Sequence, residues 1–253
     1  MIPKIIHYCW FGGNDKLESV MKCIESWKKY LPDYEIMEWN ESNFNIKKAN
    51  QYVREAYDNK KWAFVTDYVR LIALYENGGI YFDTDVEVFK SFDSLLSEKA
   101  FFGFESKDYL CTAVIACEKG NSFIKKFIDS YENRKFILSD GSFDTATTNV
   151  VAVTRMLLSK GLRPNGKMQI VDDVTIYPQY YFSSNNLINV FHKYNHRIFS
   201  YHHCQASWYI SSRDGSFFDL FRHYIIGKLR NIIGTDFLLS IKKSVSSQKL
   251  AHN

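Results

Sequence analysis

The chain has 253 residues, 32 of them Lys or Arg and 28 Asp or Glu, and its small net charge of +4 does not favour nucleic-acid binding. This length suits one domain, or one domain with an appendage. Five cysteines without C-x-x-C spacing indicate reduced thiols rather than a disulfide framework or a zinc site. We expect a cytoplasmic protein, because the N-terminus lacks a signal-peptide core and no run approaches ~18 apolar residues.

Strand and helix patterns alternate along the chain. Strand patterns cover 4–10, 34–39, 80–88, 100–104, 113–117, 168–182 and 197–203, and helical patterns cover 16–30, 47–58, 61–76, 121–132 and 145–160. Such alternation predicts an α/β fold with a mixed central sheet flanked by helices. In sheets of this kind ligands bind at the carboxyl ends of the strands.

The helix predicted over 61–76 carries Asp67 and Arg70, which are three residues apart and therefore share one face. One interpretation is an exposed ion pair worth a few tenths of a kcal/mol. We favour a functional role, because the pair leads through Gly78 and Gly79 into an acidic strand. The two glycines tolerate positive φ and are typical of a helix end.

That strand pattern, residues 80–88, holds two carboxylates, Asp83 and Asp85. Side chains two apart on a strand point to the same side. Two close carboxylates repel each other unless a cation lies between them, and Mg²⁺ and Mn²⁺ prefer carboxylate oxygens. The alternative is a solvated strand end with two unrelated acids.

The segment 213–253 contains seven Lys or Arg against three Asp, which accounts for the whole net charge. Large apolar residues recur there at near-helical spacing. A basic amphipathic helix is typical of contact with an anionic membrane surface. The alternative is a C-terminal helix docked on the core with solvated basic residues.

Residues 63–85 read A-x-x-x-D-x-x-R-x-x-x-L-Y-x-x-G-G-I-Y-x-D-x-D. This block resembles the sugar-binding region of family 32 glycosyltransferases, and the clostridial glucosylating toxins look like distant relatives. The opening at 2–13 is similar to the family's first strand and turn. The sequence H-H-C-Q-A-S-W at 202–208 is similar to its closing H-H-x-x-x-S-W element.

The resemblance implies a GT-A-like nucleotide-sugar fold over 1–212, with 213–253 as a helical appendage. It implies a retaining, metal-dependent glycosyltransferase that moves a hexose from a nucleotide sugar, with UDP favoured, to a saccharide or lipid-linked acceptor. Bacterial capsular or other surface polysaccharide synthesis is the process it suggests. We then expect the enzyme in the cytoplasm, in peripheral contact with the cytoplasmic face of the membrane through 213–253.

The resemblance also implies site roles. Asp85 would be the principal carboxylate ligand of Mn²⁺ or Mg²⁺, and Asp83 would bind the metal or the ribose side. A C-terminal histidine would complete the metal sphere, and imidazole suits Mn²⁺ better. We favour His203 over His202, because His203 enters the loop towards Ser207.

The remaining donor contacts are also read from the resemblance. Asp67 and Arg70 would hold sugar hydroxyls, ribose or phosphate, and Ser207 and Trp208 would hydrogen-bond the diphosphate. Trp10, at the end of the first strand, would stack on the base; a core position is the alternative.

The sequence leaves the choice of pocket acid and two alternative functions open. The sequence does not choose among Glu105, Asp140 and Asp144 as pocket acids. A D-x-D-x-[TV] phosphohydrolase also uses two aspartates on a strand, but the fifth position here is Glu87. A non-catalytic sugar- or lipid-binding module is a further alternative, although it would not need a metal-binding pair of acids.

Overall fold

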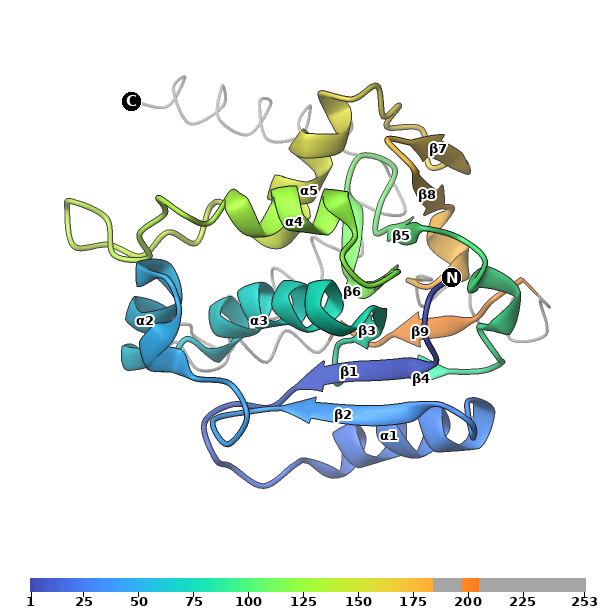
Figure 1. Ribbon diagram of the computed structural model, residues 1–253, viewed down its shortest axis with the longest axis horizontal. Helices are drawn as coiled ribbons and strands as arrows, with labels where there is room; N and C mark the ends of the chain where they lie inside the picture. The colour runs from blue at the N-terminus through green and yellow to red at the C-terminus, as the bar shows by residue number, and fades with distance from the viewer. Residues whose placement is uncertain (184–196, 205–253) are drawn as a thin grey trace, which may run out of the picture. The chain divides into compact units, whose positions relative to one another are not determined.

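The computed structural model describes residues 1–183 and 197–204, which form a mixed α/β unit (Figure 1). Its strands are β1 (Ile5–Cys9), β2 (Glu35–Trp39), β3 (Gly79–Phe82), β4 (Val86–Val88), β5 (Ala100–Phe104), β6 (Leu110–Cys117), β7 (Gln169–Val171), β8 (Val174–Tyr177) and β9 (Ser200–His202). Its α-helices are α1 (Glu18–Tyr30), α2 (Gln51–Asp58), α3 (Trp62–Asn77), α4 (Ser122–Asp129) and α5 (Asn149–Leu158). The fold class expected from the sequence is confirmed.

Seven strands form the central sheet in the order β2-β1-β3-β6-β5-β8-β7. Strand β1 lies parallel to β2 and β3, whereas β6 runs antiparallel to both β3 and β5. The carboxyl ends of β1 and β3 therefore meet at the same edge of the sheet. Strands β4 and β9 form a separate antiparallel pair that follows β3 in the chain.

Side chains alternate along the central strands and so build two buried clusters. On β3, Ile80 and Phe82 pack in the cluster that contains α1, whereas Tyr81 packs in the cluster that contains α2, α3, α4 and α5. Helices therefore bury both faces of the sheet, which is the usual solution for strands that are apolar on both sides.

Helix α1 also positions β4. The indole N–H of Trp27 donates to the carbonyl of Val86 at 2.7 Å, and the Val88 N–H donates to the hydroxyl oxygen of Ser26 at 2.9 Å. These bonds attach β4 to the helix rather than to the central sheet. The sequence prediction of one strand over 80–88 is therefore wrong, because the chain turns between β3 and β4.

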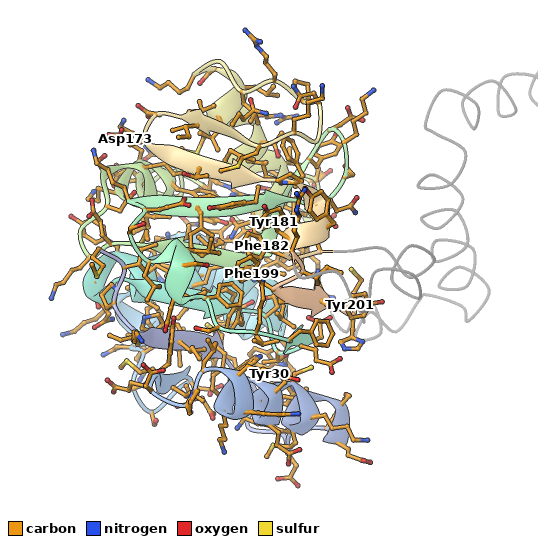
Figure 2. All side chains as sticks on the ribbon, turned by 90° about the vertical axis from the view of Figure 1, so that its right-hand side faces the viewer. Tyr30, Asp173, Tyr181, Phe182, Phe199 and Tyr201 are labelled. Atoms are coloured by element: carbon orange, nitrogen blue, oxygen red, sulfur yellow. The ribbon has the colours of Figure 1, made fainter. Side chains whose placement is uncertain are left out.

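An aromatic cluster fixes the residues that lead into β9 (Figure 2). The Phe199 ring stacks on Tyr181, with 5.8 Å between ring centroids, and contacts Phe182 and Phe92 at 6.0 and 5.2 Å. Its backbone N–H donates to the Tyr181 carbonyl at 2.9 Å. Aromatic contacts of this kind add to the free energy of area burial. Strand β9 is thereby held against β4, although it is distant from it in sequence.

The tail predicted as a basic amphipathic helix, 213–253, lies outside the described residues. Within residues 1–183 and 197–204, no helix has the length and apolar content needed to cross a membrane.

The turn between α3 and β3 requires both of its glycines. Gly78 has φ +69° and Gly79 has φ +106°. A Cβ added to Gly79 would lie 2.5 Å from the carbonyl oxygen of Ile5 and 3.2 Å from Nε2 of His7. The buried His7 ring donates from Nε2 to the Gly78 carbonyl at 2.7 Å, because its Nδ1 accepts from the Trp39 indole N–H. Burial lowers the pKa of His7 to about 4, so the ring stays neutral at neutral pH.

Gly79→Ala should therefore destabilise the fold by about 3 kcal/mol or more, from positive-φ strain together with a backbone clash. Gly141→Ala is the matched control, because Gly141 has φ +83° but nothing within 4 Å of an added Cβ. It should cost only about 1 kcal/mol of strain. Urea denaturation measures both, and equal losses in the two variants would contradict the clash at Gly79.

Candidate functional site

The two aspartates lie in the turn that ends β3. The Asp83 N–H donates to the Ala113 carbonyl at 2.8 Å and so adds one bond to the β3–β6 ladder. The Val86 N–H then donates to the Asp83 carbonyl at 3.0 Å and closes a turn over Asp83-Thr84-Asp85. The acids are thus placed at the carboxyl end of β3 by a turn, not by strand alternation.

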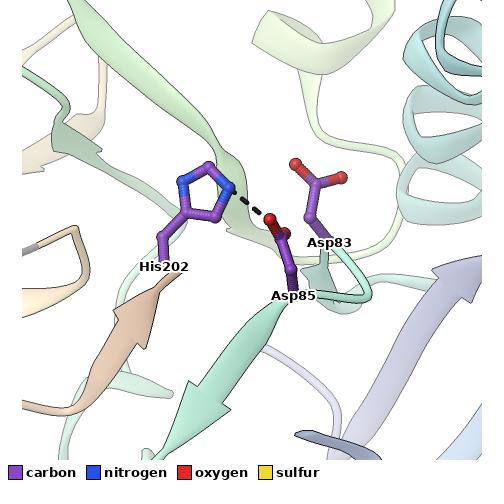
Figure 3. A group of neighbouring side chains, drawn as sticks. All are labelled: Asp83, Asp85 and His202. Carbon is purple, nitrogen blue, oxygen red and sulfur yellow. Dashed lines mark ion pairs between the residues drawn. The ribbon is translucent and has the colours of Figure 1, made fainter. Parts of the chain in front are cut away.

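Strand β9 brings His202 to these acids. It pairs antiparallel with β4, with Val86 opposite His202, and the His203 N–H donates to the Asp85 carbonyl at 3.0 Å. Nε2 of His202 lies 3.2 Å from Oδ1 of Asp85 (Figure 3). One ligand atom from each of Asp83, Asp85 and His202 lies within 4.8 Å of the others.

The placement of His203 beside the aspartates is wrong. Its Nε2 lies 3.1 Å from the Glu87 carboxylate, and its ring packs edge-on to Tyr201 at 4.6 Å between centroids. Successive residues of a strand point to opposite faces. His203 therefore lies on the side of Glu87 and Tyr201, while His202 lies on the side of Asp85.

Two carboxylates and an imidazole fit a divalent cation that accepts both oxygen and nitrogen ligands. Burial lowers the pKa of His202, but the hydrogen bonds to Asp85, Cys111 and Cys204, together with the charge of Asp85, outweigh it and raise that pKa well above its ordinary value. The protonated ring is thus the partner of Asp85 without metal, and a bound cation would take the place of that proton. The residues present therefore fit a metal site.

Arg70 is the cation that holds this acidic group together. Its side chain is only 4% exposed. Nη1 lies 3.1 Å from Oδ1 of Asp83, and Nη2 lies 3.0 Å from Oδ1 of Asp67. The guanidinium also covers the Tyr81 ring at 4.5 Å, and the Tyr81 hydroxyl donates to the same Asp83 oxygen at 3.0 Å. One oxygen of Asp83 is therefore fixed by two donors.

The other donors of Arg70 are used within the protein. Nη1 donates to the Thr112 carbonyl at 2.8 Å, and Nε donates to the Thr66 carbonyl at 3.2 Å. Nη2 also lies 3.4 Å from the Thr66 hydroxyl. In this structure Arg70 contacts Asp83 and Asp67, and its direct contact with sugar or phosphate stays a prediction.

Asp67 is less enclosed, with 15% of its side chain exposed. Burial raises its pKa to about 6, although Arg70 acts to lower it. The Asn149 amide donates to the Asp67 carbonyl at 2.7 Å and accepts from the Tyr131 hydroxyl. Asp67 is therefore held at both its backbone and its carboxylate.

Trp10 directly follows β1, whose carboxyl end lies beside that of β3. Its indole N–H donates to the Asn14 carbonyl at 2.7 Å, and Lys16 lies over the ring at 5.8 Å. The ring is half-buried and packs against the hydrophobic cluster that contains α1. Ser207 and Trp208, expected at the diphosphate, lie outside the described residues.

Of the three acids left open by the sequence, only Glu105 interacts with the Asp83–His202 group. Burial raises its pKa, with His202 and Asp83 acting in opposite directions. Asp144 pairs with Arg134 at 2.9 Å, and Asp140 accepts from Ser142 in an exposed turn.

Sequence reasoning missed three partners of the site. Tyr81 could have been found, because it lies on β3 two residues before Asp83. The Thr112 carbonyl, which accepts from Arg70, and the Cys204 thiol, whose sulfur lies 3.4 Å from Nδ1 of His202, carried no signal, since both contacts depend on β6 and β9 being in place.

Arg70→Ala should lower the free energy of unfolding by about 3–5 kcal/mol, because it leaves Asp67 and Asp83 close together without their cation. Adding Asp67→Asn to that variant should recover part of the loss, since one uncompensated charge is removed. The control Lys4→Ala removes an exposed partner of Asp33 and Asp93 and should change little. If Arg70→Ala unfolds at the same denaturant concentration as Lys4→Ala, the positioning role of Arg70 is wrong.

Comparison with known proteins finds similarity over a range that includes Asp67, Arg70, Asp83 and Asp85. Residues 18–102 match the family described as "Glycosyltransferase sugar-binding region containing DXD motif". Inositol phosphoceramide mannosyltransferase 3 of Schizosaccharomyces pombe is 31% identical over 130 residues, which cover 50% of this chain and 36% of that protein. Subversion of eukaryotic traffic protein A of Legionella pneumophila is 25% identical over 165 residues, covering 52% and 25%. The chain thus spans about a third or less of the length of these curated relatives.

Two solved glycosyltransferase structures are also similar. The PaToxG glycosyltransferase has a TM-score of 0.46 at 20% identity, over 62% of this chain and 70% of that one. A glycosyltransferase involved in glycosylation of the PBCV-1 major capsid has a TM-score of 0.47 at 12% identity, over 82% and 96%. Asp83-Thr84-Asp85 is the D-x-D sequence within the matched residues 18–102.

Proposed function

We propose that this chain is a metal-dependent glycosyltransferase that moves a hexose from a nucleotide sugar to a saccharide or lipid-linked acceptor. One observation carries the proposal: the DXD aspartates of the matched region lie with His202 at the carboxyl edge of β3, where α/β sheets bind ligands. The GT-A-like character of the fold, the retention of anomeric configuration and membership of family 32 belong to this proposal.

In this proposal some side chains would bind the cation and others would position its ligands. Asp83, Asp85 and His202 would hold the cation, for which we propose Mn²⁺ because a nitrogen ligand accompanies the two carboxylates. When bound, a cation of this kind neutralises the charge that develops on a diphosphate leaving group. Arg70 and Tyr81 fix Oδ1 of Asp83 before any ligand arrives, so that carboxylate needs no reorganisation on binding.

Two other residues would contact the donor. The partly exposed Asp67 carboxylate can accept hydrogen bonds from sugar hydroxyls while Arg70 holds it from behind. Trp10 presents a half-buried ring at the same edge of the sheet and would stack on the base, which favours a UDP-sugar.

The acceptor would be a saccharide or a lipid-linked saccharide. The name of the S. pombe relative gives mannose as its sugar and a lipid as its acceptor. We keep surface polysaccharide synthesis on a lipid-linked acceptor as the proposed process for this chain, with mannose donors included in the test below.

Hydrolysis of nucleotide sugars tests the activity without knowledge of the acceptor. Purified protein is incubated with UDP-glucose, UDP-N-acetylglucosamine and GDP-mannose, with Mn²⁺ or with EDTA, and released nucleoside diphosphate is measured. We expect release from at least one donor with Mn²⁺, none with EDTA, and loss of more than about 100-fold in Asp85→Asn, which removes a carboxylate ligand.

Glu87→Gln is the matched control, because Glu87 lies two residues from Asp85 but pairs with His203. It should keep most of the activity. Full activity of Asp85→Asn in EDTA would contradict the metal role. Release of free phosphate from a monoester, rather than of nucleoside diphosphate from a donor, would favour the phosphohydrolase alternative.

We also propose cytoplasmic localisation and peripheral contact with anionic membranes through 213–253, because that segment carries the whole net positive charge. The protein should sediment with anionic liposomes at low salt, less at high salt, and hardly at all with neutral liposomes. A chain ending at residue 212 should lose the binding. Equal sedimentation with neutral liposomes would contradict the electrostatic basis.

A further inference from the structure

The second nitrogen of the His202 ring has its own partner. Nε2 faces Asp85, and Nδ1 on the other side of the ring lies 3.4 Å from Sγ of Cys204. The same sulfur lies 3.6 Å from the backbone carbonyl of His202, to which the thiol donates. A carbonyl can only accept, so the S–H can be donated to it, and the sulfur is then able to accept a hydrogen bond from Nδ1–H.

This arrangement determines which nitrogen can bind a cation. A neutral imidazole carries one N–H and one lone pair, and the partner of one nitrogen sets the role of the other. With the hydrogen on Nδ1, the lone pair is on Nε2, on the side of Asp85 and Asp83. Histidines that bind metals usually donate their other N–H to such a partner, which fixes both tautomer and ring orientation.

The backbone of Cys204 supports a specific role. Its φ is +51°, a left-handed conformation that non-glycine residues rarely adopt and that costs about 1–2 kcal/mol. This conformation directs the side chain back towards the residue two positions earlier, His202. Strain of this kind persists where the surrounding structure requires it.

Cys204 differs from the other thiols near the site. Cys111 also hydrogen-bonds the His202 side chain, but it is buried and its sulfur accepts from the Ser183 hydroxyl at 2.9 Å. Cys204 is exposed, whereas the other four cysteines of the chain are buried. A thiol reagent in solution therefore meets Cys204 first.

We propose that Cys204 is a positioning residue for His202, holding the imidazole so that Nε2 faces Asp83 and Asp85 and so raising the affinity of the site for a divalent cation. The inference rests on the metal site of the proposed function. It adds that chemical modification of the exposed Cys204 thiol weakens cation binding, although Cys204 is not itself a metal ligand.

The test is Mn²⁺ binding by the 253-residue chain, measured by electron paramagnetic resonance of free Mn²⁺ and by calorimetry. Cys204→Ala and Cys204→Gly should each weaken binding about tenfold, as loss of a hydrogen-bonding partner of a ligand does. Cys204→Ser should stay within about threefold of the wild type, because a hydroxyl can donate to the carbonyl and accept from Nδ1–H. Glycine relieves the positive φ, so equal losses in Ala and Gly assign the effect to the thiol rather than to the backbone.

Two controls separate this inference from the proposed function. His202→Ala should abolish binding, whereas His203→Ala, which removes the neighbouring ring that faces Glu87, should leave it unchanged. Iodoacetamide should weaken Mn²⁺ binding of the wild type and leave Cys204→Ser unaffected.

If the wild type binds Mn²⁺ and His202→Ala does not, but Cys204→Ala binds as the wild type does, the positioning role is overturned. Serine as weak as alanine would overturn the hydrogen-bonding basis. Absence of Mn²⁺ binding in the wild type would overturn the metal site and, with it, this inference.

Discussion

The site depends on the guanidinium of Arg70. Two partly exposed carboxylates, Asp67 and Asp83, lie against this buried side chain, and a third, Asp85, follows two residues after Asp83. Without Arg70 these negative charges would repel one another with no cation between them. With it, Asp83 is held in one orientation while Asp85 and His202 complete the group. Helix α3, the turn at Gly78 and Gly79, and strand β3 together place this arginine beside the carboxyl end of β3.

A second constraint is the pairing of β9 with β4, which brings His202 to the aspartates. Strand β9 is short and is separated from β8 by more than twenty residues, yet its register opposite β4 determines which histidine reaches Asp85. Phe199 supplies the anchor through its contacts with Phe92, Tyr181 and Phe182. The high aromatic content thus contributes here mainly to core packing, and it does so at the point where a shift of one residue would exchange His202 for His203.

The sequence predicted the local elements well and the long-range geometry less well. Helix α3, strand β5 and the glycine turn follow from spacing and φ preferences, which are local properties. The break between β3 and β4 was missed, because the residues that hold β4, Ser26 and Trp27, lie in α1. The protein partners of Arg70 and the choice between His202 and His203 were not predicted for the same reason. Whether an arginine faces ligand or protein, and which of two adjacent histidines faces an acid, is decided by partners distant in sequence.

The most direct test of the account is to locate the cation. Crystals grown with Mn²⁺ and UDP, with diffraction collected at a wavelength where manganese scatters anomalously, would place the ion without assumptions about activity. The account predicts one anomalous peak at about 2.0–2.3 Å from carboxylate oxygens of Asp83 and Asp85 and from Nε2 of His202, distances typical of divalent metal ligation. A peak at Glu87 and His203, or no ordered metal beside Asp85, would contradict it.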